Sequence, residues 1–207
     1  MKKSLKLAGV LFLSLGFQAT AQAFFIDFEN GTDGAAVNDI TGVSFQSFNG
    51  FDAIYGDSCV TTYNTTSDDG GCSNGGGYHH YGDKWLWAGP NATAQGVIVD
   101  FTNNDGTWFT TGYAANSLFY VDAYLTDGSM VSVVGANNYG SPMSFLSVNA
   151  TTGNFIDYLV LHDTGNYWLV DNMSGDASGV NVPEPSTLAM LGLGIVGFGF
   201  MRRRQGS

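Results

Sequence analysis

Residues 117–135 read Ser-Leu-Phe-Tyr-Val-Asp-Ala-Tyr-Leu-Thr-Asp-Gly-Ser-Met-Val-Ser-Val-Val-Gly. Successive side chains of a β-strand point to opposite faces, so residues two apart share a face. Four apolar residues at this spacing share one face of a strand over 117–126: Phe119, Val121, Ala123 and Leu125. Asp127-Gly128 follows and is a two-residue signal for a β-hairpin turn into 129–135. The stretch therefore predicts an antiparallel hairpin with one buried face.

Short runs of the same type recur along the chain, separated by Gly, Asn, Asp and Ser, and no apolar period of 3.6 residues competes with them. This pattern predicts an all-β fold, a single β-sandwich of jelly-roll type, with one long polar loop over 63–77. Besides 117–126 and 129–135, the expected strands are 24–28, 43–48, 51–55, 84–88, 95–101, 107–113, 143–149, 154–162 and 166–173.

The N-terminus has the three parts of a secretory signal peptide. Lys2, Lys3 and Lys6 form a basic region, residues 8–17 are mostly apolar, and Ala21-Gln22-Ala23 has the small-residue pattern of a cleavage site. We therefore expect residues 1–23 to be a signal peptide that is cleaved after Ala23.

The C-terminus has a second signal, in which Pro183-Glu184-Pro185 precedes an uncharged run over 188–201 and then three arginines. As a helix this run would span roughly 21 Å, which is shorter than the roughly 30 Å hydrocarbon core of a bilayer. It is therefore expected to be a short transmembrane helix. The positive-inside rule keeps the arginines cytoplasmic and places the preceding chain across the membrane.

Residues 182–204 resemble the PEP-CTERM sorting signal. The resemblance implies export across the inner membrane of a Gram-negative bacterium, transient anchoring through the C-terminal helix, and processing by an exosortase that releases the chain to the cell surface or beyond. It divides the chain into a signal peptide (1–23), an exported domain (24–181) and a sorting signal (182–207). The residues that it assigns to recognition rather than catalysis are Pro183, Glu184, Pro185, Arg202, Arg203 and Arg204.

The exported domain is strongly acidic. The whole chain has a formal charge of −11, but residues 24–181 contain seventeen Asp and Glu and a single basic residue, Lys84, which gives a charge of about −16. Such a surface repels nucleic acid and anionic lipid, and it favours solubility. It can also recruit divalent cations through carboxylate oxygens.

Both cysteines, Cys59 and Cys72, lie in the exported domain. An even number of cysteines in an oxidising compartment predicts one disulfide, which here would close a polar loop. A catalytic cysteine is the alternative, although neither residue has a convincing partner in the sequence.

The order of strands also resembles exported PEP-CTERM jelly-roll domains and, more loosely, carbohydrate-binding-module sandwiches. The likeness lies in the first strand and its turn (26–31) and in the last strand (167–173). In such sandwiches the two ends jointly hold a structural Ca²⁺, and ordinary turn chemistry is the alternative. The resemblance implies five ligand positions here: Asp27, Glu29, Asn30, Gly31 and Asp171.

Two further groups of side chains are candidates for binding. Trp85 and Trp87 share a strand face, and exposed aromatic rings stack on sugars, although the same face could equally be core. Other aromatic residues considered with them are Trp108, Tyr113, Tyr124 and Tyr139. His79, His80 and Asp83, with His162, are a weaker candidate for a transition-metal site, because adjacent strand residues point to opposite faces.

No catalytic motif stands out, and Glu29 is the only glutamate of the exported domain. We therefore expect a non-catalytic envelope or extracellular-matrix protein associated with exopolysaccharide or another carbohydrate. The expected partners are an exosortase, exopolysaccharide and, before processing, the membrane. The alternative is a small secreted polysaccharide-active hydrolase that uses an unidentified pair of Asp residues.

Overall fold

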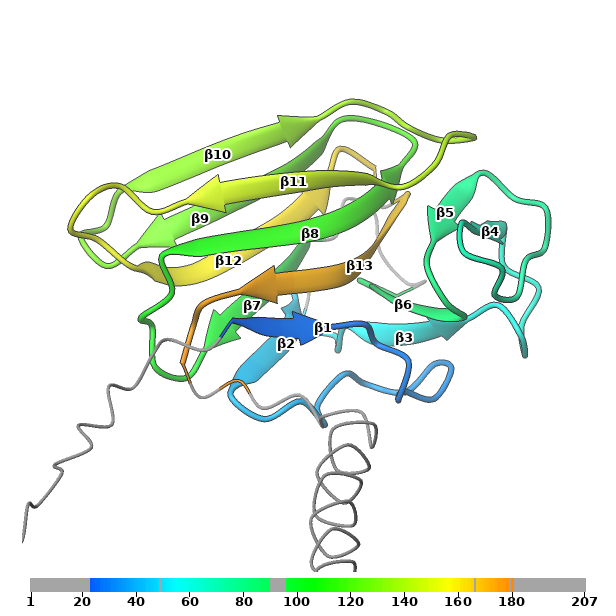
Figure 1. Ribbon diagram of the computed structural model, residues 1–207, viewed down its shortest axis with the longest axis horizontal. Coiled ribbons are helices and arrows are strands. Elements are labelled where there is room, and N and C mark those ends of the chain that lie inside the picture. Colours follow the sequence, from blue (N-terminus) through cyan, green and yellow to red (C-terminus); the bar gives the residue numbers. More distant parts are fainter. Residues whose placement is uncertain (1–22, 49, 90–95, 166, 179, 181–207) are drawn as a thin grey trace, which may run out of the picture.

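The computed structural model describes residues 23–48, 50–89, 96–165, 167–178 and 180. The described chain consists of strands and loops, and its two main sheets stack face to face (Figure 1). This confirms the all-β sandwich. The strands are β1 (Phe24–Ile26), β2 (Val43–Ser47), β3 (Ile54–Asp57), β4 (Thr65–Ser67), β5 (Tyr78–His80), β6 (Lys84–Trp87), β7 (Gly96–Phe101), β8 (Trp108–Ala115), β9 (Phe119–Leu125), β10 (Met130–Gly135), β11 (Ser144–Asn149), β12 (Ile156–Asp163) and β13 (Trp168–Gly175).

The predicted hairpin over 117–135 is confirmed as β9 and β10. Met130 lies opposite Tyr124 and Gly135 opposite Phe119, so the two strands pair antiparallel across the Asp127-Gly128 turn. Gly128 has a φ of 82°, a conformation that glycine adopts readily. The alternation of β9 is also as expected, because the face with Phe119, Val121, Ala123 and Leu125 is buried.

One main sheet has five strands in the order β10-β9-β12-β7-β2, and the other has six. In the six-stranded sheet the path is β11-β8-β13-β6-β3, and β1 also pairs with β13. Since β8 occupies one edge of β13, β1 and β6 follow one another along its other edge. The first and last strands of the domain are therefore neighbours, as the sequence analysis expected.

The main hydrophobic core lies between the two sheets. It is built from the inward faces of the strands, with Phe109, Phe119 and Leu86 among its fully buried side chains. Aromatic rings pack closely in it; Tyr113 stacks on Phe119 with ring centroids 5.0 Å apart. Tyr113 is thus a core residue and does not belong to a surface binding site.

A second, smaller cluster lies on the outer face of the six-stranded sheet. Residues 58–83, here called the cap segment, run over this face and carry β4 and β5, which pair parallel to each other. Figure 1 shows these two short strands at one end of the sandwich. The sequence pattern predicted a loop over 63–77, and β4 at Thr65–Ser67 corrects that prediction.

The two end signals lie outside the described residues, apart from Ala23, which is exposed. Among the residues that the structure describes, none forms a helix long and apolar enough to cross a membrane. The predicted transmembrane helix over 188–201 falls outside that part of the chain.

Candidate functional site

A cleft with a volume of about 130 Å³ lies where the cap segment meets the outer face of the six-stranded sheet. Its walls come from the cap segment, from β6 and from the start of β13. Six of the nine lining residues are aromatic, and the full set is Tyr63, Asn64, Thr65, Tyr78, Trp85, Trp87, Tyr167, Trp168 and Leu169.

Trp85 and Trp87 form one wall of the cleft, and the predicted sharing of a face is confirmed. Between them, Leu86 points the other way into the main core. The two indoles differ in exposure, because Trp85 is only 2% exposed whereas Trp87 is partly exposed. Trp85 is therefore part of the packed wall, and Trp87 is the indole that a ligand can reach.

Tyr63 of the cap segment holds both indoles in place. Its ring meets Trp85 edge to face at 5.2 Å and Trp87 at 6.0 Å between centroids. The Tyr63 hydroxyl donates to Asp33 Oδ1 at 3.0 Å. Burial, helped by this hydrogen bond to a carboxylate, raises the pKa of Tyr63 to about 12, so the hydroxyl stays protonated at physiological pH.

The backbone under Trp85 has to be glycine. A Cβ on Gly56, the β3 residue opposite Trp85, would lie 2.3 Å from the indole ring. Trp85 also packs against the ring of His80, with ring centroids 4.9 Å apart. These contacts leave the Trp85 side chain almost fully buried.

The rim of the cleft carries polar groups, and Tyr167 is 64% exposed there. Asn64 donates from Nδ2 to the Tyr139 hydroxyl at 2.6 Å, and Tyr139 meets Tyr78 edge to face at 4.9 Å. Within the described part of the chain, the buried Nε1 of Trp87 has no hydrogen-bond acceptor. Aromatic walls with a few orienting polar groups are typical of small-ligand sites.

Three aromatic residues singled out from the sequence, Trp108, Tyr113 and Tyr124, do not join the cleft. Tyr124 lies on the opposite sheet, where its ring stacks on Tyr158 at 4.5 Å. Sequence analysis missed the contributions of Tyr63, Tyr78 and Tyr167. Tyr78 directly precedes His79 and His80 in the sequence, but no local sequence pattern indicates that the cap segment lies over β6.

The histidines do not converge. His79 Nδ1 lies 2.6 Å from Asp68 Oδ1, whereas His80 is fully buried with Nε2 at 3.0 Å from Ser58 Oγ. His162 lies on β12 in the other sheet, 3.0 Å from Asp122. Burial lowers the pKa of His80, which keeps its ring neutral at physiological pH. These positions give no support to a transition-metal site at His79 and His80.

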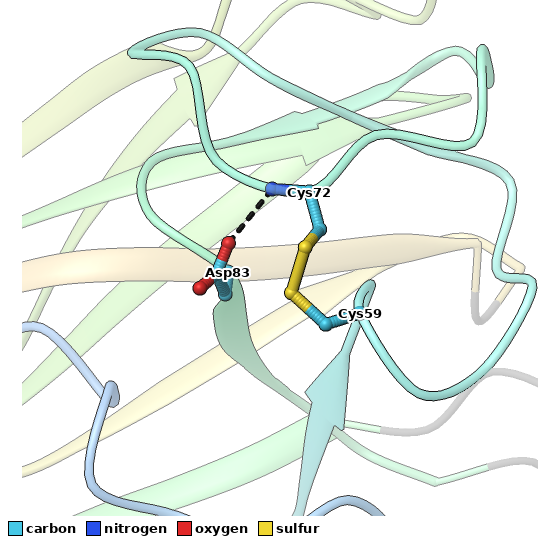
Figure 2. A group of neighbouring side chains, drawn as sticks. All are labelled: Cys59, Cys72 and Asp83. Atoms are coloured by element: carbon cyan, nitrogen blue, oxygen red, sulfur yellow. Dashed lines mark hydrogen bonds between the residues drawn. A yellow bond between two sulfur atoms is a disulfide. The ribbon is translucent and has the colours of Figure 1, made fainter.

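The predicted disulfide between Cys59 and Cys72 is confirmed, and it closes a loop of the cap segment. Figure 2 shows Asp83 beside it, where the Asp83 carboxylate accepts the Cys72 backbone N–H at 2.7 Å. Of the described residues, Cys59, Cys72 and Asp83 are the three whose potential metal-ligand atoms come within 4.8 Å of one another. Because the sulfurs are bonded to each other, neither is available as a thiolate ligand or a nucleophile.

The residues of the expected Ca²⁺ site lie where β1 ends beside β13. Asp171 is fully buried and accepts backbone N–H groups from Tyr81 at 2.9 Å and Asn172 at 2.7 Å. Burial holds the pKa of Asp171 well above its usual range, and the charges of Glu29 and Asp27 raise it further.

Glu29 is already engaged in this region. Its Oε1 accepts the backbone N–H groups of Asp83 and Lys84 at 2.9 and 3.0 Å, at the start of β6. Asp27 accepts the Glu29 N–H at 3.2 Å, and Gly31 donates to the Phe28 carbonyl in the following turn. Asn30 is exposed. Asp27 and Glu29 lie near enough to Asp171 to raise its pKa, but the oxygens of these three carboxylates do not all come within 4.8 Å of one another. A bound Ca²⁺ stays a prediction.

Together these features define a β-sandwich protein with an aromatic cleft beside a disulfide-closed cap segment. In comparisons with known proteins, residues 181–204 match the PEP-CTERM protein-sorting motif. This confirms the sorting signal and marks an exported protein that is processed by an exosortase at the membrane. No curated protein matches the chain.

Among solved structures, similarity is found to CBM29_1, a family 29 carbohydrate binding module from Piromyces equi, with 11% identity, a TM-score of 0.41 and coverage of 74% of this chain and 91% of that one. A D114A mutant of CBM29-2 gives 8% identity, a TM-score of 0.40 and coverage of 79% and 100%. A GH26-CBM35 β-(1,4)-mannanase from Podospora anserina gives 12% identity, a TM-score of 0.34 and coverage of 79% and 29%. These similarities are remote, so the function is argued from the cleft itself.

Proposed function

We propose that this chain is an exported, non-catalytic protein of the Gram-negative envelope or extracellular matrix that binds saccharide in the aromatic cleft. The sorting motif supports the exported location. The observation that carries the binding role is the cleft wall, in which Trp87 is accessible while Tyr63 and Trp85 fix its orientation. A ring held in this way loses little conformational freedom when a flat, apolar C–H face of a sugar packs on it.

The cleft offers hydrogen-bonding groups together with its rings. The Asn64 amide and the tyrosine hydroxyls can meet sugar hydroxyls. Exopolysaccharide of the producing bacterium is the ligand that fits an exported matrix protein, and it is part of this proposal.

The lining argues for binding over hydrolysis. A glycoside hydrolase needs two carboxyl groups that flank the scissile bond, roughly 5 to 9.5 Å apart. None of the described residues that line the cleft is Asp or Glu. This observation favours the binding role over the alternative of a small polysaccharide-active hydrolase.

A glycan array and a pull-down with the host's own exopolysaccharide test the proposal. Trp87→Ala should weaken saccharide binding by roughly ten-fold or more, as expected for a central aromatic contact. Trp108→Ala is the matched control, because Trp108 lies on β8 outside the cleft lining. Trp85→Ala is a poor probe, since truncating an indole buried to this extent costs about 3–5 kcal/mol of stability.

Two outcomes would contradict the proposal. One is equal binding by the Trp87→Ala variant and the wild-type protein, and the other is steady release of reducing ends from the polysaccharide. Circular dichroism of each variant establishes that the sandwich is intact.

A further inference from the structure

The charge around the cleft bears on which saccharides it accepts, an inference that rests on the proposed function. The nine lining residues are all uncharged at neutral pH. Burial raises the pKa of both Tyr63 and Tyr78 to about 12, so their hydroxyls remain neutral donors. A ligand in the cleft therefore meets rings, hydroxyls and an amide.

The domain has almost no cation to offer an anionic ligand. Lys84 is the single basic residue between positions 24 and 181, apart from histidines. Its Nζ donates to the Glu29 carbonyl at 2.8 Å and lies 3.8 Å from Asp57 Oδ2. Lys84 does not line the cleft. The arginine and lysine contacts on which recognition of carboxylate and sulfate groups depends are thus missing from this lining.

Carboxylates stand behind the cleft wall on two sides. Asp33 accepts the hydroxyl of Tyr63 at 3.0 Å on the cap side. On the side of β13, Asp163 accepts the backbone N–H of Tyr167 at 3.1 Å, and its charge contributes to the raised pKa of Tyr78. The charged groups that are hydrogen-bonded to Tyr63 and Tyr167 therefore have the sign that repels an anion.

We propose that the cleft selects uncharged saccharides and excludes polyanionic ones such as uronate-containing or sulfated chains. An anionic sugar would lose hydration in an aromatic cleft without gaining a cationic partner, and it would approach a domain with a charge of about −16. A neutral sugar loses only hydroxyl hydration, which the amide and hydroxyl groups of the lining replace.

Affinity electrophoresis of the protein isolated from its native host tests this selection. The probes are a neutral glucan, a neutral galactomannan, alginate and polygalacturonate, each with chelator and with millimolar Ca²⁺. Retardation by at least one neutral polymer, with none by the two acidic polymers in chelator, is the expected result.

If an acidic polymer in chelator binds more tightly than the neutral polymers, the proposed selection is wrong, although the protein still binds saccharide. Acidic polymers that bind only with Ca²⁺ would also overturn it, because they would show that bound cations reverse the charge of the site. Failure of every neutral and acidic polymer, and of the host polysaccharide, would reject the proposed function together with the inference.

A variant with an added positive charge tests whether electrostatic repulsion is the cause of this selection. Asn64 is exposed and lines the cleft, so Asn64→Lys places a cation at the rim. One attraction between unit charges about 4 Å apart in bulk water corresponds to roughly a five-fold gain in affinity. We expect a gain of this order for alginate, lost at about 1 M salt, where the screening length is about 3 Å.

Asn64→Gln is the matched control, because it also disturbs the hydrogen bond to the Tyr139 hydroxyl but adds no charge. Equal effects of Asn64→Lys and Asn64→Gln on alginate binding would contradict an electrostatic origin of the selection.

Discussion

At the scale of single residues, Asp171 is a fully buried carboxyl group on β13. Its carboxylate is fully buried beneath the cap segment, with backbone N–H groups of Tyr81 and Asn172 as its donors. Burial nevertheless outweighs these hydrogen bonds and holds the pKa of Asp171 well above its usual range. The folded protein therefore binds this proton more tightly than the unfolded chain does.

The pH dependence of stability follows from that difference. A group with a raised pKa in the folded state contributes stability at low pH and loses that contribution as pH rises from the unfolded pKa, near 4, through the folded pKa. The stability contribution is about 1.4 kcal/mol for each tenfold difference in proton affinity between the folded and unfolded states. In chelator, the wild-type free energy of unfolding should rise relative to that of Asp171→Asn as pH falls from 7 toward 4. Parallel curves for the two proteins in urea titrations would contradict this assignment.

The arrangement of Trp85 and Trp87 could be predicted from the sequence only in part. Two-residue spacing correctly placed Trp85 and Trp87 on one face, because strand alternation is local. Their different exposure was not predictable, since it depends on the cap segment, which is held over β6 by contacts such as that between Tyr81 and Asp171, 90 positions apart.

At the scale of elements, the disulfide links the cap segment to the cleft. Tyr63, Asn64 and Thr65 lie inside the loop that Cys59 and Cys72 close. The cysteines and their compartment predicted the bridge. The short strands β4 and β5 escaped prediction because each is only three residues long and neither shows an alternating apolar pattern.

Removing the disulfide should affect both stability and binding. For a loop of this length the chain-entropy model gives about 3 kcal/mol. The Cys59→Ser/Cys72→Ser double variant should lose about this much in urea unfolding. It should also bind saccharide more weakly, because Tyr63 is no longer fixed against Trp87. Unchanged affinity in a variant of reduced stability would show that the cap segment does not shape the cleft.

The pairing of β1 with β13 also leads to a testable prediction, which concerns Ca²⁺ binding. It brings Asp27 and Glu29 to the same end of the sheet as Asp171, and we predict that Ca²⁺ binds there. Binding to the folded state alone adds roughly 2.7 kcal/mol when free Ca²⁺ is 100 times its Kd. The melting temperature should therefore rise from chelator to millimolar Ca²⁺, and less so in Asp27→Asn. Identical melting temperatures with and without Ca²⁺ would reject the ion.

At the scale of the whole molecule, an acidic sandwich precedes the sorting motif at 181–204, and a signal peptide is predicted before it. Hydrophobic alternation predicted most of the sandwich, because nearly every long strand has a core face with a two-residue period. It could not predict the cleft, which forms where segments far apart in sequence, around Tyr63, Trp87 and Tyr167, come together.

The sorting motif and the predicted signal peptide together predict where the mature chain begins and ends. Ala23 is exposed, and Phe24 begins β1 opposite Gly175, so cleavage after Ala23 leaves the first strand intact. Intact-mass measurement of protein released by the native host should give a chain that begins at Phe24 and lacks the residues following the Pro-Glu-Pro motif. Full-length chain that still ends at Ser207 in the medium would contradict this processing.

The measurement that tests the binding account most directly is an NMR titration of the ¹⁵N-labelled protein with the neutral oligosaccharide that binds best. The chain has four tryptophans, and three of them line the cleft whereas Trp108 does not. We predict that the indole N–H signal of Trp87 shifts on saturation, because a sugar stacks on its ring, while the signal of Trp108 stays in place. Saturable binding that shifts Trp108 and leaves Trp87 unmoved would contradict the account.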